Sequence, residues 1–248
     1  MIANSERTRR ELINHIGLRA ERIHTIYLGS EMRNEATHEE RATARERLGL
    51  AGRHPLLVFV GALGHDHNKG FDTLWRAWKL LCARSDWNAH LLVAGGGRGV
   101  ARWRELIDKD GMSGRVKLLG FTERMTDVLA AGDLLVSPVR YEAYGLNVHE
   151  AICRGMPALV SGRAGITELF SASLAEMLLP DPEDANDLAR RLIAWRENAD
   201  TWRERFKPLA ARLRSRTWRD MAAEMVAISK AGEGFAATED HACATSVV

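Results

Sequence analysis

The chain has 248 residues, 46% of them hydrophobic and 27% charged, which suits one well-filled globular domain or a domain with appendages. This composition excludes a disordered or fibrous protein. The 35 Lys and Arg residues against 33 Asp and Glu residues leave a net charge of +2, which gives no reason to expect nucleic acid or another polyanion as a partner.

Three cysteines, Cys82, Cys153 and Cys243, lie far apart and lack the spacing of metal ligands. An odd number of separated cysteines indicates free thiols in a reducing compartment. The first residues, MIANSERTRREL, contain no apolar stretch of the kind found in a signal peptide, and no run approaches the roughly 20 apolar residues of a membrane-spanning helix. The sequence therefore predicts a cytoplasmic protein.

Short apolar runs alternate with helical patterns through most of the chain. Strands are predicted over residues 23–28, 56–60, 90–94, 116–119, 134–137, 158–161 and 177–179. Helices are predicted over residues 35–48, 71–83, 100–110, 125–131, 144–154 and 184–197. This alternation predicts an α/β fold, a Rossmann-like doubly wound parallel sheet with helices on both faces.

The pattern divides the chain into four segments. Residues 1–34 fit the main domain poorly and are predicted as a helix and a strand reached by a linker, whereas residues 35–199 form the main domain. Residues 200–232 contain no strand pattern and are predicted as helices broken near Pro208 and again at 215–217. Residues 233–248 are expected to be a disordered tail.

The stretch YEAYGLNVHE, residues 141–150, places Glu142 and Glu150 around Gly145, directly after a predicted strand. In open parallel sheets, ligands bind where strands end and helices begin, and the unpaired amides of a helix N-terminus bind phosphate. Gly145 would let the backbone approach such a group closely. An acid on each side of a phosphate site matches a nucleoside diphosphate sugar, which has a ribose and a hexose flanking two phosphates.

An isolated pair of acids also has an ordinary explanation. Glu142 would stabilise the helix dipole as a first-turn acid, and Glu150 would lie on a solvated face. Three further loops bear on the choice. A strand ends at Gly61 and is followed by Lys69, a mobile positive charge suited to phosphate; Gly96 stands in the run LLVAGGGRG; and Phe121 follows a strand in LLGFTERM, where its ring could pack on a base. Each of these loops alone is unspecific.

Taken together, VGALG, NKGFDTL, LLVAGGG, VKLLGFT and SPVRYEAYGLNVHEAICRGMPALVSGRAGITEL resemble the donor-binding half of the retaining two-domain glycosyltransferases of the GT-B type, family 4, called glycosyl transferases group 1. The resemblance covers roughly residues 55–194 in order. It implies transfer of a hexose from a UDP- or GDP-sugar to an acceptor glycan or lipid-linked sugar, with retention of configuration and without a metal ion or other cofactor.

The resemblance also assigns roles to residues. Lys69 and Glu142 are the expected catalytic residues, because in the family the lysine neutralises phosphate and the first glutamate holds the donor. The two glutamates would bind the hydroxyls of the sugar and the ribose. The expected donor-binding residues are Gly61, Lys69, Gly96, Phe121, Glu142, Ala143, Tyr144, Gly145, Leu146 and Glu150.

Two departures from the family pattern matter. Ala62 stands where many members carry a basic residue, and Arg140 or Arg163 is a candidate replacement for that charge. Residues 1–34 resemble only the last strand, helix and linker of the family's acceptor-binding domain. We therefore expect a truncated chain or one half of a split enzyme, with a separate N-terminal acceptor domain as partner. The alternative is a non-catalytic nucleotide-sugar-binding or scaffolding subunit that needs a partner acceptor domain for activity.

Other motifs favour ordinary explanations. The acids of Asp108-Lys109-Asp110 fall at the polar end of a helix, and His65-Asp66-His67 lacks a third ligand nearby, so neither predicts a metal site. The run GGGRG has the wrong spacing for a dinucleotide fingerprint. The basic stretch over residues 190–219 is typical of a solvated helix surface and leaves a peripheral contact with the inner, anionic face of the membrane open.

Overall fold

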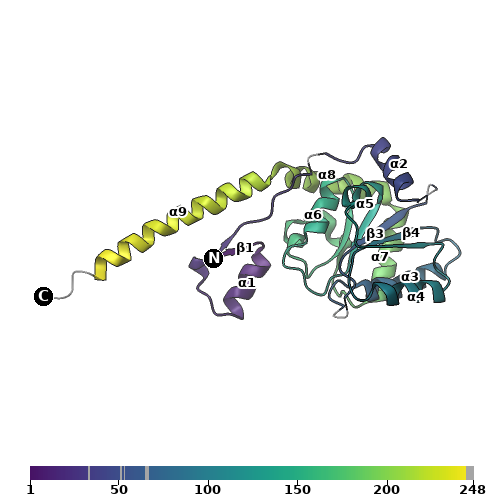
Figure 1. Cartoon of the computed structure of the whole chain (residues 1–248), viewed down its shortest axis with the longest axis horizontal. Coiled ribbons are helices and arrows are strands. Elements are labelled where there is room, and N and C mark those ends of the chain that lie inside the picture. Colours follow the sequence, from purple (N-terminus) through teal and green to yellow (C-terminus); the bar gives the residue numbers. More distant parts are fainter. Residues whose placement is uncertain (33, 51, 53, 65–66, 244–248) are drawn as a thin grey trace.

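The computed structural model describes residues 1–32, 34–50, 52, 54–64 and 67–243, and from residue 231 onwards only the backbone. Six parallel strands form the main sheet in the order β5-β4-β3-β6-β7-β8. Figure 1 labels two of its central strands, β3 and β4. Their bounds are β3 Leu56–Val60, β4 His90–Ala94, β5 Val116–Gly120, β6 Leu134–Ser137, β7 Ala158–Ser161 and β8 Leu178–Leu179. The predicted α/β doubly wound sheet is confirmed.

The central strands are apolar along their whole length because both faces of the sheet are covered. Leu57 and Val58 of β3 pair with Leu91 and Leu92 of β4 on one side, and with β6 on the other. All four of these side chains are at most 1% exposed. Burial on both faces explains why the strands lack the polar alternation of a half-exposed sheet.

Helices cover both faces of the sheet. Figure 1 shows α3 and α4 on one side and α5, α6 and α8 on the other. Helix α2 packs against α5, α3 against α7, and α6 against α8. Their bounds are α2 His38–Arg47, α3 Phe71–Cys82, α4 Val100–Lys109, α5 Met125–Ala131, α6 Leu146–Cys153, α7 Ala185–Glu197 and α8 Ala199–Ser215, with short 3-10 helices η2 Gly165–Leu169 and η3 Ala172–Met177.

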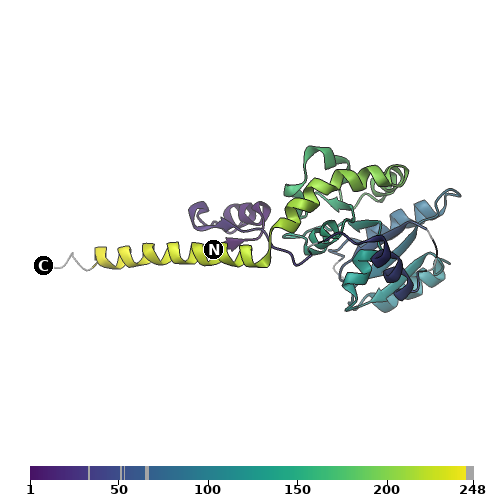
Figure 2. The same ribbon diagram turned by 90° about the horizontal axis from the view of Figure 1, so that it is seen from above.

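The first residues form a small unit of their own. Strands β1 (Ile2–Ala3) and β2 (His24–Thr25) pair in a separate two-stranded parallel sheet, with helix α1 (Glu6–Asn14) and the 3-10 helix η1 (Ala20–Arg22) between them. Figures 1 and 2 both show this unit beside helix α9 (Trp218–Cys243) and outside the body that contains the main sheet. The strand predicted over residues 23–28 thus pairs with β1 and not with the main sheet.

The C-terminal helices differ from the sequence-based expectation at Pro208. Helix α8 runs through this residue, so the predicted break there is wrong, whereas the break before Trp218 is present. The helix tolerates the missing amide because Phe206, Leu209 and Leu213 are buried on either side of the proline. Helix α9 continues through residues 233–243 of the expected tail, and residues 244–248 lie outside the described residues.

Among the residues that the structure describes, no helix combines the length and apolar character needed to cross a membrane.

Candidate functional site

Most of the predicted site residues lie in the loops that follow β3 and β6, two neighbouring strands of the sheet, or on α6 directly after the second loop. The two loops are joined by a backbone hydrogen bond and by a hydrogen bond from one side chain. Arg140 donates its amide to the Asn68 carbonyl at 2.8 Å, and the Asn68 side chain donates to the Tyr141 carbonyl at 3.1 Å. A Cβ added at Gly70 would lie 1.9 Å from the Pro138 carbonyl oxygen. The loop that carries Lys69 is therefore packed directly on the loop that carries Glu142.

This close approach makes Gly70 a sensitive position. We expect Gly70→Ala to lower the free energy of unfolding by about 2–5 kcal/mol, because it adds a backbone clash to the penalty for a left-handed conformation. Urea denaturation measures the loss. Gly111→Ala is the matched control: its φ of 69° resembles the 74° of Gly70, but no atom lies within 4 Å of the added Cβ. Equal losses in the two variants would contradict the role of the Pro138 contact.

Lys69 and Glu142, the two expected catalytic residues, form an ion pair. Lys69 Nζ lies 2.5 Å from Glu142 Oε2, and the two side chains are 31% and 22% exposed. The residues are 73 positions apart in the sequence, and the fold brings them into contact without any ligand. The charge of Lys69 is thus paired with a carboxylate, and both side chains remain accessible to solvent.

The N-terminus of α6 provides unpaired backbone donors next to this ion pair. Gly145 occupies the N-cap position with φ 110° and offers no side chain to cap the helix. Within the described part of the chain, the amides of residues 143–146 donate no hydrogen bond. Several consecutive free amides at a helix N-terminus form an anion-binding concavity, and the helix dipole adds to its positive potential. A Ser, Thr or Asp cap would have occupied part of it.

Glu150 lies two turns further along α6 and differs from Glu142 in its surroundings. Its side chain is half-buried and takes part in no hydrogen bond or ion pair with the described residues. Burial raises the pKa of the Glu150 carboxyl above its usual range. A half-buried carboxylate with no partner is unfavourable in the free protein and marks a position where a ligand hydroxyl can bind.

The loop between the glutamates uses its backbone and turns its tyrosine inward. Tyr144 is 2% exposed, and its hydroxyl lies 2.8 Å from Nδ1 of His149. Burial lowers the pKa of His149 to about 4, so the imidazole is neutral at physiological pH. The carbonyls of Ala143 and Tyr144 accept bonds from Ser5 and Ile166. Only the backbone of Tyr144 can therefore face a ligand, while its side chain braces the start of α6.

The remaining expected residues lie along the same edge of the sheet. A Cβ on Gly61 would touch the Lys69 side chain at 3.1 Å, and a Cβ on Gly96 would lie 3.3 Å from Phe121 Cβ. Phe121 is 81% exposed and directly follows β5. The structure thus brings Gly61 together with the ion pair, and it places Gly96 and Phe121 as a second pair, one and two strands further along the edge.

The two candidate replacements for the missing basic residue differ in availability. Arg140 binds Asp72 through two hydrogen bonds of 2.9 and 2.8 Å and Glu183 through a third of 2.9 Å. The hydrogen bond to Asp72 is the main reason that the pKa of Arg140 is raised. The charge of Arg140 is therefore already paired with these two carboxylates. Arg163 is exposed, has no side-chain partner among the described residues, and directly precedes Ala164, which bridges to Glu142. Arg163 therefore remains the available candidate.

The motifs set aside as metal sites have local partners. Asp108 accepts a hydrogen bond from Ser113, and Asp110 lies 3.7 Å from the Lys79 ammonium. Within the described ranges no three His, Cys, Asp or Glu side chains are grouped so that they could hold a metal ion, and His65 and Asp66 lie outside the described residues.

A cavity of about 960 Å³ lies at the opposite edge of the sheet, away from every expected site residue. There Arg41 and Arg45 bind Asp133 at 3.0 and 2.6 Å. Both arginines also donate to carbonyls at the end of α5. These contacts attach α2 to α5. The charges of Arg41, Arg45 and Asp133 therefore stabilise the packing of these helices.

Sequence reasoning missed two residues that shape the site. The Asn147 side chain donates to the Val60 carbonyl at 2.8 Å and ties the first turn of α6 to the end of β3. Ser5 donates to the Ala143 carbonyl at 2.7 Å across 138 positions. Ser5 is recognisable in the sequence as a helix N-cap, but no local pattern reveals its distant partner.

The family model described as Glycosyl transferases group 1 matches residues 40–213. Alpha-D-kanosaminyltransferase from Streptomyces kanamyceticus is 30% identical over 214 residues, which cover 84% of this chain and 54% of that protein. D-inositol 3-phosphate glycosyltransferase from Nocardia farcinica is 31% identical over 194 residues, 75% of this chain and 42% of that protein. The chain thus spans about half the length of these curated relatives.

Solved structures show the same fold. Sucrose-phosphate synthase from Thermosynechococcus elongatus superposes with a TM-score of 0.78 at 24% identity and covers 95% of this chain and 58% of its own. Anabaena HepE in complex with UDP and glucose superposes with a TM-score of 0.80 at 21% identity and covers 93% of this chain and 62% of its own.

Proposed function

Because the chain belongs to the glycosyl transferases group 1, we propose that it binds a nucleoside diphosphate sugar between α6 and the loop after β3, for transfer of the sugar to an acceptor. The observation that carries this proposal is the row of amides at residues 143–146, which have no acceptor among the described residues and lie beside the ion pair of Lys69 and Glu142. A diphosphate needs hydrogen-bond donors and positive charge, and both converge at this point.

The two phosphates would occupy the N-terminus of α6. There the free amides donate to phosphate oxygens, and Gly145 leaves room for them. Lys69 would leave Glu142 and turn to the diphosphate, whose two negative charges attract it more strongly than one carboxylate. Glu142, once released, would accept hydrogen bonds from hydroxyls of the sugar. No metal ion is part of this proposal, since the lysine and the amides offset the charge.

The nucleoside would lie toward Glu150. Its half-buried carboxylate can accept two hydrogen bonds from the ribose hydroxyls and so gain the partner that it lacks. The exposed ring of Phe121 offers a surface on which a base could stack. HepE was solved with UDP, with UDP and glucose, and with UDP-glucose, and these complexes make UDP-sugars the first donors to test and GDP-sugars the second.

In the transfer step, the bond between the anomeric carbon and the diphosphate breaks, and the oxygen of an acceptor hydroxyl bonds to that carbon. Negative charge grows on the leaving diphosphate, which takes up the proton of the hydroxyl. Lys69 and the amides of α6 would stabilise that charge, a contribution of the oxyanion-hole type. Glu142 would hold the sugar in register. Retention of configuration and an acceptor such as a glycan or lipid-linked sugar belong to the proposal through the family resemblance.

A panel of UDP- and GDP-sugars, read by thermal shift and then by calorimetry, tests the binding proposal. A ligand at one hundred times its Kd stabilises the folded state by about 2.7 kcal/mol, so a true donor raises Tm measurably. Uridine without phosphates is the matched control and is expected to leave Tm unchanged. If no nucleoside diphosphate or its sugar raised Tm, the proposed site would be refuted.

Radiolabelled sugar transfer to added acceptors tests catalysis separately. Product formation by this chain, with the anomeric configuration read by NMR, supports the transferase. Donor binding without transfer by this chain, restored by an added acceptor-domain polypeptide, supports a subunit that needs a partner. Donor binding without transfer in both arms favours the non-catalytic alternative.

A further inference from the structure

The first 28 residues contact the donor loop, defined here as residues 141–145. Ser5 donates its hydroxyl to the Ala143 carbonyl at 2.7 Å, and Thr8 approaches the same oxygen at 3.3 Å. Ser5 is fully buried and is also the N-cap of α1, because it accepts a bond from the Thr8 amide at 3.0 Å. One hydroxyl thus joins the start of α1 to the backbone of the proposed donor site.

Glu168 holds the same helix from the other side. Its two carboxylate oxygens accept bonds from the amides of Glu6 and Arg7 at 2.9 and 2.5 Å, and from the Tyr27 hydroxyl at 3.1 Å. These amides belong to the first turn of α1, where a negative charge interacts favourably with the helix dipole. Burial, followed by the hydrogen bond to Glu168, raises the pKa of Tyr27 to about 12, so its hydroxyl remains a donor.

Glu168 is attached to the donor loop through the backbone. It stands on η2, whose first amides, from Gly165 and Ile166, donate to the carbonyls of Glu142 at 3.0 Å and Tyr144 at 2.7 Å. A Cβ on Gly165 would lie 2.2 Å from the Ala143 carbonyl oxygen and 2.7 Å from Ser5 Cβ. Helix η2, the donor loop and the start of α1 are therefore packed together without room for a side chain between them.

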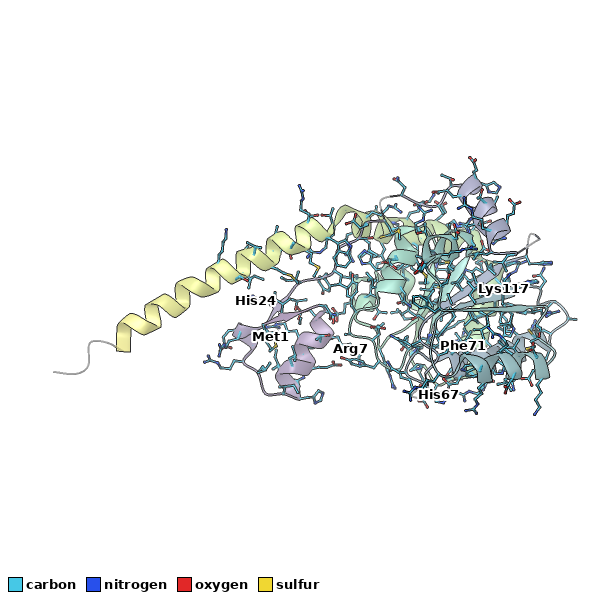
Figure 3. The ribbon with its side chains drawn as sticks, in the orientation of Figure 1. Met1, Arg7, His24, His67, Phe71 and Lys117 are labelled. Carbon is cyan, nitrogen blue, oxygen red and sulfur yellow. The ribbon has the colours of Figure 1, made fainter. Side chains whose placement is uncertain are left out.

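The flanking tyrosines extend the contact. Tyr141 donates its hydroxyl to Glu11 at 2.7 Å, and the Arg7 guanidinium lies 5.3 Å from the centre of the Tyr141 ring. The rings of Tyr27 and Tyr144 are 6.4 Å apart. Figure 3 shows Arg7 between α1 and the body of the molecule. Residues 141, 143 and 144 of the donor loop thus each contact the N-terminal segment.

This contact is built from polar groups. Helix α1 has no fully buried side chain, and the donor loop meets it through hydroxyls, carboxylates and a guanidinium. The apolar side chains of Ile23 and Ile26 are buried at the end of the N-terminal segment, whereas α1 buries little apolar surface. Contacts of the α1 kind open at low free-energy cost, so docking of α1 can respond to other binding events.

We propose that Glu168 is a positioning residue, which holds α1 by its first-turn amides and so keeps Ser5 seated on the donor loop, making nucleotide affinity depend on docking of residues 1–28. The inference rests on the proposed donor site and adds a coupling that the site residues alone do not have. By linkage, a nucleotide that binds the ordered loop also tightens docking of the N-terminal segment by the same factor.

Hydrogen exchange and UDP calorimetry on the full chain test this coupling with Glu168→Ala, Glu168→Gln and Ser5→Ala. We expect Glu168→Ala to speed amide exchange both in α1 and in the donor loop, and to weaken UDP binding by ~5–50-fold. Glu168→Gln keeps one acceptor oxygen but loses the charge, and is expected to fall between wild type and Ala. Ser5→Ala removes the hydrogen bond to the Ala143 carbonyl. It should speed amide exchange in the donor loop as Glu168→Ala does.

Two controls separate coupling from general destabilisation. Glu176→Ala removes an exposed acid without a side-chain partner in the described chain, and Gly111→Ala lowers stability far from the site. Both should leave the exchange of the donor loop and the affinity for UDP unchanged. Faster exchange confined to α1 in the Glu168 and Ser5 variants would overturn the coupling. If the wild-type chain bound no UDP, the donor site would be refuted. The exchange measurement needs no nucleotide, so it would still test whether α1 and the donor loop are coupled.

Discussion

Replacing Lys69 with Met is expected to weaken UDP binding by ~10–150-fold, because a hydrogen bond between charged groups contributes about 1.5–3 kcal/mol. The loss should shrink as salt concentration rises, since the interaction is electrostatic and the lysine is partly exposed. Calorimetry at low and high ionic strength measures both effects. Lys79→Met is the matched control. Lys79 lies on α3, is half-exposed, and stands 3.7 Å from its own acid, Asp110, the C-cap of α4.

The partner variant gives a contrasting result. Because Glu142 holds Lys69 in the free protein, Glu142→Gln releases the lysine for phosphate. We expect UDP affinity to stay the same or rise, while the additional affinity for UDP-sugar over UDP disappears. A parallel loss of UDP affinity in both variants would show that the ion pair supports the site as a unit and that the exchange of partners is wrong.

Glu150→Gln is expected to raise Tm at pH 7 and at the same time to weaken nucleotide binding by ~10–100-fold. Burial raises the pKa of this carboxyl in the folded state. The folded protein therefore prefers the protonated form, and a stability cost appears as the pH rises from the unfolded pKa of about 4.3 through the folded pKa. Glutamine carries no charge and removes that cost, but it also loses the carboxylate that the ribose hydroxyls would bind.

Thermal melts at several pH values check the stability half of this prediction. The gain in Tm over wild type should be largest at pH 7 and should vanish near pH 4, where the wild-type carboxyl is protonated. Glu46→Gln, an exposed position on α2, is the control and should show no such pH dependence. A lower Tm for Glu150→Gln at neutral pH would mean that the carboxylate has a stabilising partner in the free protein. Stability and function conflict at such a site, as is common for binding residues that are buried before their ligand arrives.

Local patterns in the sequence predict the elements of the main domain well. The strands over residues 56–60, 90–94, 134–137 and 158–161 have the predicted bounds, because strands buried on both faces must be apolar along their whole length. Helix α5 also has its predicted bounds. The helix predicted from residue 144 instead begins at Leu146, because Gly145 adopts a left-handed conformation before it. The break predicted at Pro208 is wrong, because the burial of neighbouring apolar side chains in α8 outweighs the low helix propensity of proline.

The sequence by itself determined the fold class, the family and the glutamates on either side of Gly145, since these depend on residues close together in the chain. Only the tertiary structure decided which groups meet. It pairs Lys69 with Glu142, spends the charge of Arg140 on Asp72 and Glu183, and seats Ser5 on the donor loop. Local propensity and periodicity depend on residues a few positions apart, whereas these contacts join residues from 43 to 138 positions apart and form only when distant elements pack together.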